Sequence, residues 1–205
     1  GEAEYLGTAI PYEGCRSMEI IEPLGKAYLV GYPRHCLYEY DLSTRISRCL
    51  GRIGTWGGFE IVRDSKDRLY GSSDDGRMFR YLPASGEFEA LSLRVPGIPG
   101  REKLYNFFFF ARRFRDDFIC ATGYYDGHIF RFNPEEGAEG SIEDYGFGWP
   151  GGWNGRDWTP PYVQAPVLYK NRWLFYGCNT IWEPTCLTVL DTRSRRKDVV
   201  SVLNF

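Results

Sequence analysis

The hydrophobic and polar positions of the chain follow a pattern that is written four times. In each copy, an apolar and aromatic run is followed by a short break and then by a second run in which apolar and polar residues alternate. The four copies begin at Lys26, Arg68, Asp117 and Arg172. Alternation with a period of two is typical of half-buried β-strands, and a unit repeated along the chain indicates a repeat architecture.

Each of these hairpins is flanked by two further strand-like segments, one before it and one after it. The preceding segments are residues 17–21, 59–62, 105–110 and 165–169, and the following ones are 46–53, 87–95, 141–147 and 197–203. Short polar turns with residues suited to chain reversal join them, such as 113–116 ahead of the third hairpin. Four antiparallel strands in a meander, repeated, indicate the blades of a β-propeller.

The repeat therefore predicts an all-β fold with about four blades of four strands each, over residues 16–53, 58–95, 104–147 and 162–204. Residues 1–11 are similar to the fourth-strand segment 86–96, which predicts the outer strand of a preceding blade. Because both ends then carry outer strands, we expect a fragment of a larger ring of roughly six to eight blades, with exposed edges at its first or last blade. A compact four-bladed ring with a surplus strand is the alternative.

One copy carries a resemblance to known propellers. Residues 67–71 (DRLYG) and 75–86 (DGRMFRYLPASG) resemble the blades of kelch-like, streptogramin-lyase-like and gluconolactonase-like proteins. The resemblance extends over nearly the whole chain and implies blade architecture. These propellers include lyases, lactonases and binding modules, so it implies no single activity. The double glycine of kelch blades is not regularly present and the WD dipeptide is absent, so no subfamily is assigned.

The connections between the strands divide into two sets. Successive connections of a meander alternate between its two ends, so the second and fourth connections of every blade emerge on one face. These loops are long and contain five of the six tryptophans, whereas the turns of the other face, around Lys66, Glu135 and Arg195, are short and charged. Long aromatic loops on a rigid scaffold are typical of a binding site. The alternative is that the tryptophans, Trp56 and Trp149 above all, pack between blades.

The loop face supplies our candidate ligand-binding residues. They combine aromatic rings for stacking with charged groups for hydrogen bonding, which predicts a carbohydrate or another polar, ring-containing small-molecule ligand. Asp75 and Asp126 also belong to ordinary hairpin turn sequences, so a turn role is their alternative. The candidates are Tyr32, Arg34, Trp56, Asp75, Tyr124, Tyr125, Asp126, Trp153, Arg156, Asp157, Trp158 and Trp182.

His35 and His128 stand at matching places, each just before the third strand of its blade. We expect both on the loop face and at least partly exposed, as a catalytic base and acid or as turn residues. A second candidate function is therefore a lyase or lactonase in which a histidine is the base and loop carboxylates hold a divalent cation. A third is a scaffold that binds proteins, because arginine, tryptophan and tyrosine suit protein interfaces equally well.

Charge and composition argue against several classes of partner and site. A net charge of −2 argues against a nucleic-acid partner, which normally meets a basic face. No apolar run approaches the roughly 20 residues of a membrane helix. The six cysteines form no close CxxC pair, which argues against zinc and favours buried free thiols, and Cys178 and Cys186 are expected to face each other across the fourth hairpin.

Overall fold

The computed structural model describes residues 3–5, 7–54, 60–97, 108–122, 127–150, 162–179 and 185–203. The described chain forms four antiparallel sheets of four strands, each sheet in plain sequence order. Apart from the 3-10 turn η1 (Glu22–Leu24), no helix occurs in the described ranges. The predicted all-β propeller fold of four-stranded blades is confirmed.

The strands of the four blades have the following bounds. Blade 1 holds β1 (Gly14–Ile21), β2 (Lys26–Tyr32), β3 (Cys36–Asp41) and β4 (Ser47–Arg52), and blade 2 holds β5 (Val62–Arg63), β6 (Leu69–Ser72), β7 (Arg77–Leu82) and β8 (Glu87–Arg94). Blade 3 holds β9 (Phe108–Phe114), β10 (Asp117–Thr122), β11 (His128–Asn133) and β12 (Ser141–Phe147). Blade 4 holds β13 (Tyr162–Tyr169), β14 (Trp173–Asn179), β15 (Thr185–Asp191) and β16 (Lys197–Leu203).

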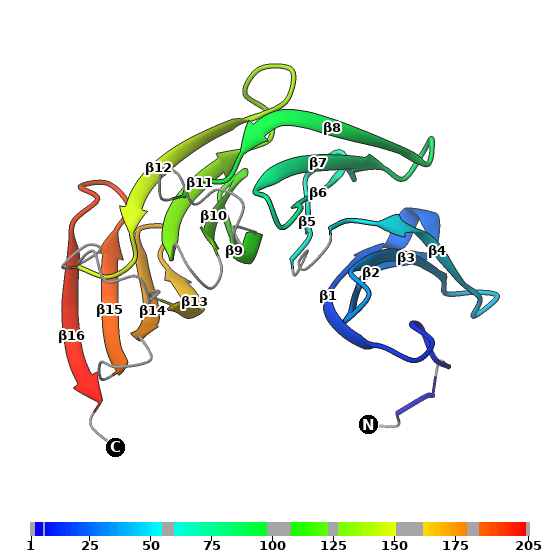
Figure 1. The fold of residues 1–205 in the computed structure, drawn as a ribbon, viewed down its shortest axis with the longest axis horizontal. Helices are drawn as coiled ribbons and strands as arrows, with labels where there is room; N and C mark the ends of the chain where they lie inside the picture. The colour runs from blue at the N-terminus through cyan, green and yellow to red at the C-terminus, as the bar shows by residue number, and fades with distance from the viewer. Residues whose placement is uncertain are drawn as a thin grey trace.

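The blades are arranged side by side in an open arc (Figure 1). The first strand of each blade (β1, β5, β9 and β13) lies on the inner side of the arc, and the last (β4, β8, β12 and β16) lies on its outer side. The two termini lie at opposite ends of the arc. This is the arrangement of part of a propeller ring.

Neighbouring blades pack face to face through aromatic side chains of their middle strands. The ring of Tyr28 on β2 meets that of Tyr81 on β7, with centroids 5.6 Å apart. One blade further on, Tyr70 on β6 meets Phe132 on β11 at 5.1 Å. All four side chains are almost fully buried. The same contact thus recurs between blades, because a repeated sequence places a large aromatic ring at the same position of each interface.

The first strand of blade 3, predicted at residues 105–110, continues to Phe114, and the turn after it is shorter than the predicted 113–116. Within the described part of that region, Phe114 at the end of β9 pairs with Asp117 at the start of β10. Only two residues remain for the turn, and Arg115 takes a left-handed φ of 58° there. Phe114 is buried in the core between blades 3 and 4, so continuing the strand encloses an aromatic ring that a longer turn would expose.

The described residues of the segment 3–11 form no strand, and the ladder partners of an outer strand would be the other strands of a preceding blade. The segment instead covers the free face of blade 1. Ile10 is buried there in a cluster with Leu29 and Tyr40, and the Ser47 hydroxyl donates to the carbonyl oxygen of Ala9. Its position along β4 is the one that the outer strand of a preceding blade would occupy.

All six cysteines lie in the described part of the chain and are unbridged. Cys120, Cys178 and Cys186 are buried, as expected, whereas Cys15 and Cys49 are exposed, which the sequence did not predict. Cys178 and Cys186 are direct cross-strand partners on β14 and β15, which confirms that they face each other. None of the described helical segments is long and apolar enough to cross a membrane.

Candidate functional site

The strongest candidate site lies on the loop face of blades 1 and 2, around His35. The turn between β2 and β3 places this residue in a left-handed conformation with φ 55°, and its carbonyl oxygen accepts from the backbone N–H of Ile53 at 2.8 Å. That bond ties the turn to the connection leading out of β4. The β2–β3 turn, which lies on the face predicted to carry the binding loops, is therefore fixed to the segment that follows β4.

Charged groups from three segments surround the imidazole of His35. Burial lowers the pKa of His35, and the positive charges of Arg52 and Arg16 lower it further, while Asp74 and Glu13 partly oppose them. The result is an imidazole that is neutral at neutral pH. A neutral imidazole has one nitrogen that donates and one that accepts hydrogen bonds, and it is also the form that acts as a base.

Tyr32 and Arg34, two predicted binding residues, lie beside His35. The Tyr32 ring is 41% exposed, its edge meets the His35 ring at a centroid distance of 5.5 Å, and the Arg16 guanidinium lies 4.4 Å over its face. The backbone N–H of Arg34 donates to Glu13 at 2.9 Å, and the Tyr38 hydroxyl donates to the other oxygen of that carboxylate. The side chain of Glu13 is fully enclosed. It fixes the turn, while Tyr32 and Arg34 remain accessible.

Asp75, in contrast, holds its own hairpin. Its carboxylate accepts from the Ser73 hydroxyl and from the Arg77 backbone N–H at 3.1 Å, and it pairs with the Arg77 guanidinium at 3.2 Å. Burial raises the pKa of Asp75, but these bonds and the charges of Arg77 and Arg94 outweigh it and lower that pKa overall. The geometry supports the turn role that its Asp-Gly sequence indicated.

His128 begins β11 in blade 3 and is held by its own blade. Its Nδ1 lies 3.1 and 3.2 Å from the two oxygens of Asp144, its ring packs against Phe147, and its backbone N–H donates to Thr122. Burial raises the pKa of Asp144, but the hydrogen bonds from His128 and from the Gly146 backbone N–H, together with the charge of Lys197, outweigh burial and lower that pKa overall. Nε2 is buried and makes no hydrogen bond within the described residues.

The prediction that both histidines are partly exposed is wrong. His35 is 4% exposed and His128 is 7% exposed, because the turns that carry them fold against the neighbouring strands. Their described surroundings share no residue, so the structure does not bring them together as an acid and base pair. Of the two histidines, His35 is the one whose charged neighbours come from two blades, with Arg16 and Arg52 in blade 1 and Asp74 in blade 2.

Several predicted residues lie outside the described residues and stay predictions. They are Trp56, Tyr124, Tyr125, Asp126, Trp153, Arg156, Asp157, Trp158 and Trp182. Among the residues that the structure describes, no group of three or more histidine, cysteine, aspartate or glutamate side chains is placed to hold a metal ion. The Lys66 and Glu135 turns lie at the other end of the strands, where the two side chains contact each other across blades 2 and 3.

Sequence reasoning missed three features of the molecule. Glu13 and Arg16 complete the surroundings of His35, although they come from the start of β1 and the segment before it. Glu60 lies partly buried just before β5, where burial raises its pKa to about 7. These residues carry no motif. Glu13 and Arg16 meet partners on β2, β3 and the turn between them, and Glu60 meets Glu19 and Arg112 of the two neighbouring blades, so only tertiary packing brings each to its partners.

Comparison with known proteins places the chain by fold. No family model matches the sequence, and no curated protein sequence matches it either. The chain is similar to the extracellular domain of a protein from B. thetaiotaomicron assigned as a one-component system, with a TM-score of 0.66 and 19% identity over 97% of this chain and 24% of that one. The chain thus spans about a quarter of that protein domain.

Two further solved structures are similar to this chain. One is a streptogramin B lyase, with a TM-score of 0.61 and 12% identity over 96% of this chain and 57% of the lyase. The other is a calcium-binding protein, regucalcin, from Agrobacterium tumefaciens, with a TM-score of 0.59 and 14% identity over 94% of this chain and 60% of that one. Identities this low show the fold alone, and the fold is a β-propeller of which this chain forms part.

Proposed function

We propose that the chain is a ligand-binding module of β-propeller fold that recognises a carbohydrate or another polar, ring-containing ligand on the loop face of blades 1 and 2. The observation that carries the proposal is the exposed ring of Tyr32 beside a neutral His35, with Arg34 next to both. The face of an aromatic ring packs against the C–H face of a sugar, and the surrounding donors and acceptors suit its hydroxyl groups.

The comparisons support this proposal by analogy of fold. One similar structure is the extracellular domain of a protein assigned as a one-component system, which by its name responds to a signal. A propeller segment with a polar and aromatic loop face suits the recognition of a small molecule in such a domain. The predicted tryptophans of the remaining loops, Trp153, Trp158 and Trp182, would extend the same face.

The test is a screen of soluble saccharides by calorimetry and glycan array, followed by Tyr32→Ala. Loss of one stacking ring is expected to weaken binding by roughly tenfold or more while the melting temperature stays the same. Tyr169→Ala is the matched control, because Tyr169 is an exposed tyrosine of blade 4. If the parent chain binds no saccharide, or if Tyr32→Ala and Tyr169→Ala bind alike, the proposal fails.

Among the described residues, His35 is the one that supports the alternative function of a lyase or lactonase. Its pKa is lowered, so the imidazole is a free base at neutral pH, and Asp74 comes from the neighbouring blade. His128 suits the role less, since its Nδ1 is engaged by Asp144 and its Nε2 is enclosed. Mass spectrometry of each ligand that the screen identifies separates the two functions, because an enzyme consumes its ligand and a binding module returns it unchanged.

A further inference from the structure

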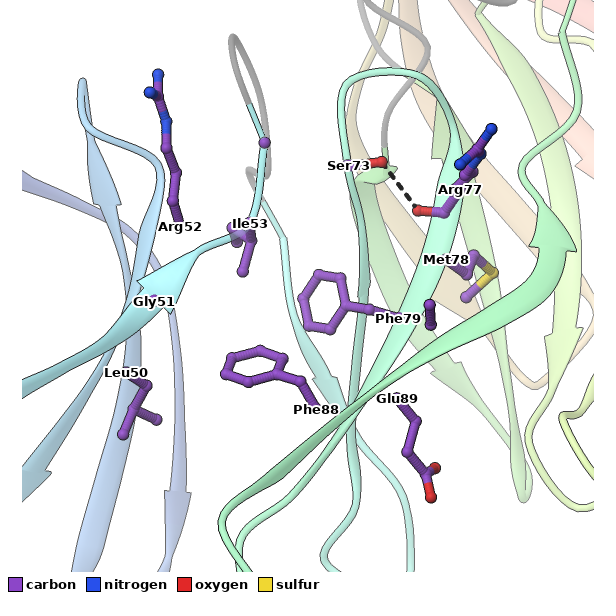
Figure 2. A pocket seen from close by; sticks show the side chains of 12 residues that line it. Leu50, Gly51, Arg52, Ile53, Ser73, Arg77, Met78, Phe79, Phe88 and Glu89 are labelled. Carbon is purple, nitrogen blue, oxygen red and sulfur yellow. Dashed lines mark hydrogen bonds between the residues drawn. The ribbon is translucent and has the colours of Figure 1, made fainter.

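A cavity of about 430 Å³ lies between blades 1 and 2, toward the outer side of the arc (Figure 2). Its volume falls within the range of small-molecule sites, roughly 300–1,000 Å³. The corresponding part of the interface between blades 2 and 3 is filled, because Leu91, Val95 and Ile142 pack together there.

Missing side-chain bulk creates the cavity. Gly51 and Gly54 line it from blade 1, and Ala90 lines it from β8. Gly71 adds to this on β6, because a Cβ atom there would lie only 2.7 Å from the Phe79 ring. The ring is thus able to lie close against its own sheet, and the space beside it stays open.

The walls of the cavity are apolar and aromatic. Leu50 and Ile53 lie on the blade 1 side, and Phe79 and Phe88 lie opposite them (Figure 2). The two rings are 6.0 Å apart between centroids, and Phe88 is 42% exposed. An aliphatic wall facing an aromatic wall forms a slot that suits a flat apolar body.

Positive charge gathers at the loop end of the slot. Arg52 and Arg77 both point toward that end in Figure 2, one from each blade. Arg77 also pairs with Asp75, but a guanidinium has five N–H donors and that contact occupies its Nε. At the other end, Glu89 is bonded by the Arg80 guanidinium, so its charge is compensated. The slot therefore has an apolar length and an arginine side chain from each blade at its mouth.

We propose that this interblade slot is a second binding site, which takes an aromatic carboxylate. The ring system would lie between Ile53 and Phe79, and the carboxylate would meet the guanidinium groups of Arg52 and Arg77 at the mouth. The proposal goes beyond the proposed function, because it concerns another ligand class and a site below the loop face rather than on it.

The test is calorimetric titration of the 205-residue chain with 2-naphthoate and with its uncharged counterpart, 2-naphthalenemethanol. Ala90→Trp places an indole in the slot from an exposed position and is expected to weaken naphthoate binding at least tenfold. Arg52→Gln is expected to weaken naphthoate by about tenfold through loss of a charge-assisted bond, and to leave the alcohol unchanged.

Matched variants keep the result interpretable. Arg196→Gln removes an exposed arginine of blade 4 and should leave naphthoate binding as it is. Tyr32→Ala should also leave it unchanged, so that failure of the loop-face proposal and failure of this one are distinguishable. If Ala90→Trp does not fold, Phe88→Ala replaces it and should weaken both probes. Absence of saturable naphthoate binding, or equal binding by the parent and a folded slot variant, overturns the proposal.

Discussion

At the scale of single residues, Glu60 is a carboxyl group whose pKa is raised far above its usual range. Burial raises its pKa from 4.5 to about 7, with the charge of Glu19 adding to the rise and Arg112 partly opposing it. In the unfolded chain the carboxyl ionises near its ordinary value. As the pH rises from 4.5 to 7, the unfolded chain therefore gives up this proton first, and the folded state loses stability relative to it.

Replacing Glu60 with glutamine should remove that dependence. We expect the free energy of unfolding of Glu60→Gln to exceed that of the parent by about 2 kcal/mol at pH 8 and to differ little below pH 4.5. Urea denaturation followed across this pH range measures it. Glu22→Gln, at an exposed carboxylate of η1, is the control and should follow the parent curve. Parallel curves for Glu60→Gln and the parent would contradict a raised pKa.

The histidines illustrate what the sequence is able to predict at this scale. Repeat equivalence placed His35 and His128 at matching positions of their blades, and in the structure His35 directly precedes β3 while His128 is the first residue of β11. Their environments were not predictable, because Arg52 and Asp74 beside His35 and Asp144 beside His128 come from other strands. A residue's place in a repeat follows from local pattern, whereas its burial follows from tertiary packing.

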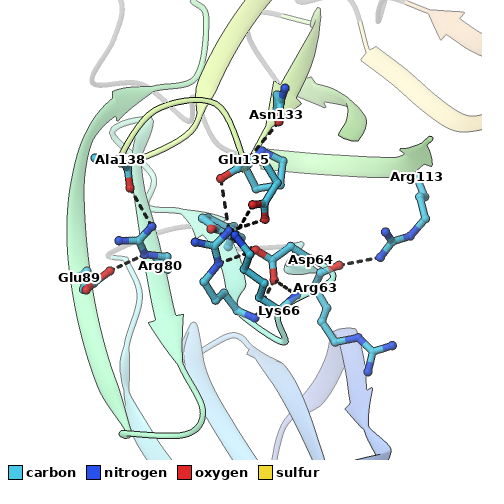
Figure 3. Close-up of polar contacts among 12 residues, drawn as sticks. Arg63, Asp64, Lys66, Arg80, Glu89, Arg113, Asn133, Glu135 and Ala138 are labelled. Carbon is cyan, nitrogen blue, oxygen red and sulfur yellow. Dashed lines mark hydrogen bonds and ion pairs between the residues drawn. The ribbon is translucent and has the colours of Figure 1, made fainter. Parts of the chain in front are cut away.

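At the scale of elements, the turns on the face opposite the loops join neighbouring blades. Asp64 accepts hydrogen bonds from the backbone N–H groups of Lys66 and Arg68, each at 2.9 Å, and from the Arg68 guanidinium at 2.6 Å. The same guanidinium reaches Glu135 of blade 3 at 2.7 Å (Figure 3). Arg80 crosses between the same blades to the carbonyl oxygen of Ala138. One buried carboxylate thus shapes a turn and orients the arginine that ties blade 2 to blade 3.

Asp64→Asn should be strongly destabilising. The Asp64 side chain is 1% exposed, and Arg68 pairs with both Asp64 and Glu135. An amide at position 64 points its N–H₂ group at other hydrogen-bond donors and removes the buried one of these two carboxylates. We expect a loss of about 3 kcal/mol in urea denaturation. Asp67→Asn removes the more exposed partner of Arg63 in the same turn and should cost less than about 1 kcal/mol. Equal losses for the two variants would show that the buried network adds nothing.

At the same scale, comparison of the predicted and observed strand bounds shows which strands the sequence is able to predict. The alternating runs located the hairpins and the outer strands well, and the strands predicted at 141–147 and 197–203 have those bounds in the structure. The inner strands were less predictable, since β5 is reduced to Val62–Arg63 and β9 continues to Phe114. The ends of these strands depend on contacts with neighbouring blades, such as that of Phe114 in the core between blades 3 and 4, rather than on their own sequence.

At the scale of the whole molecule, the two end faces of the arc differ. On the free face of blade 1, Ala9 and Ile10 pack on the cluster that contains Leu29 and Tyr40, and Ile10 is buried there. The corresponding face of blade 4 presents exposed apolar side chains among the residues that the structure describes. On β13, Val167 and Tyr169 are 61% and 53% exposed, whereas Leu168 between them points into the core shared with blade 3. In a ring, such an apolar face is where another blade packs.

We therefore expect the 205-residue chain to associate with itself through the free face of blade 4. Sedimentation velocity should show a weight-average coefficient that rises with protein concentration, because exposed apolar sheet faces associate in water. Val167→Lys combined with Tyr169→Lys should abolish the rise, since association would then desolvate two charges. Ile46→Lys, at an equally exposed position of the β3–β4 turn, should leave it in place. A parent chain that stays monomeric at all concentrations, or a double variant that associates as the parent does, would show that this face is not the contact.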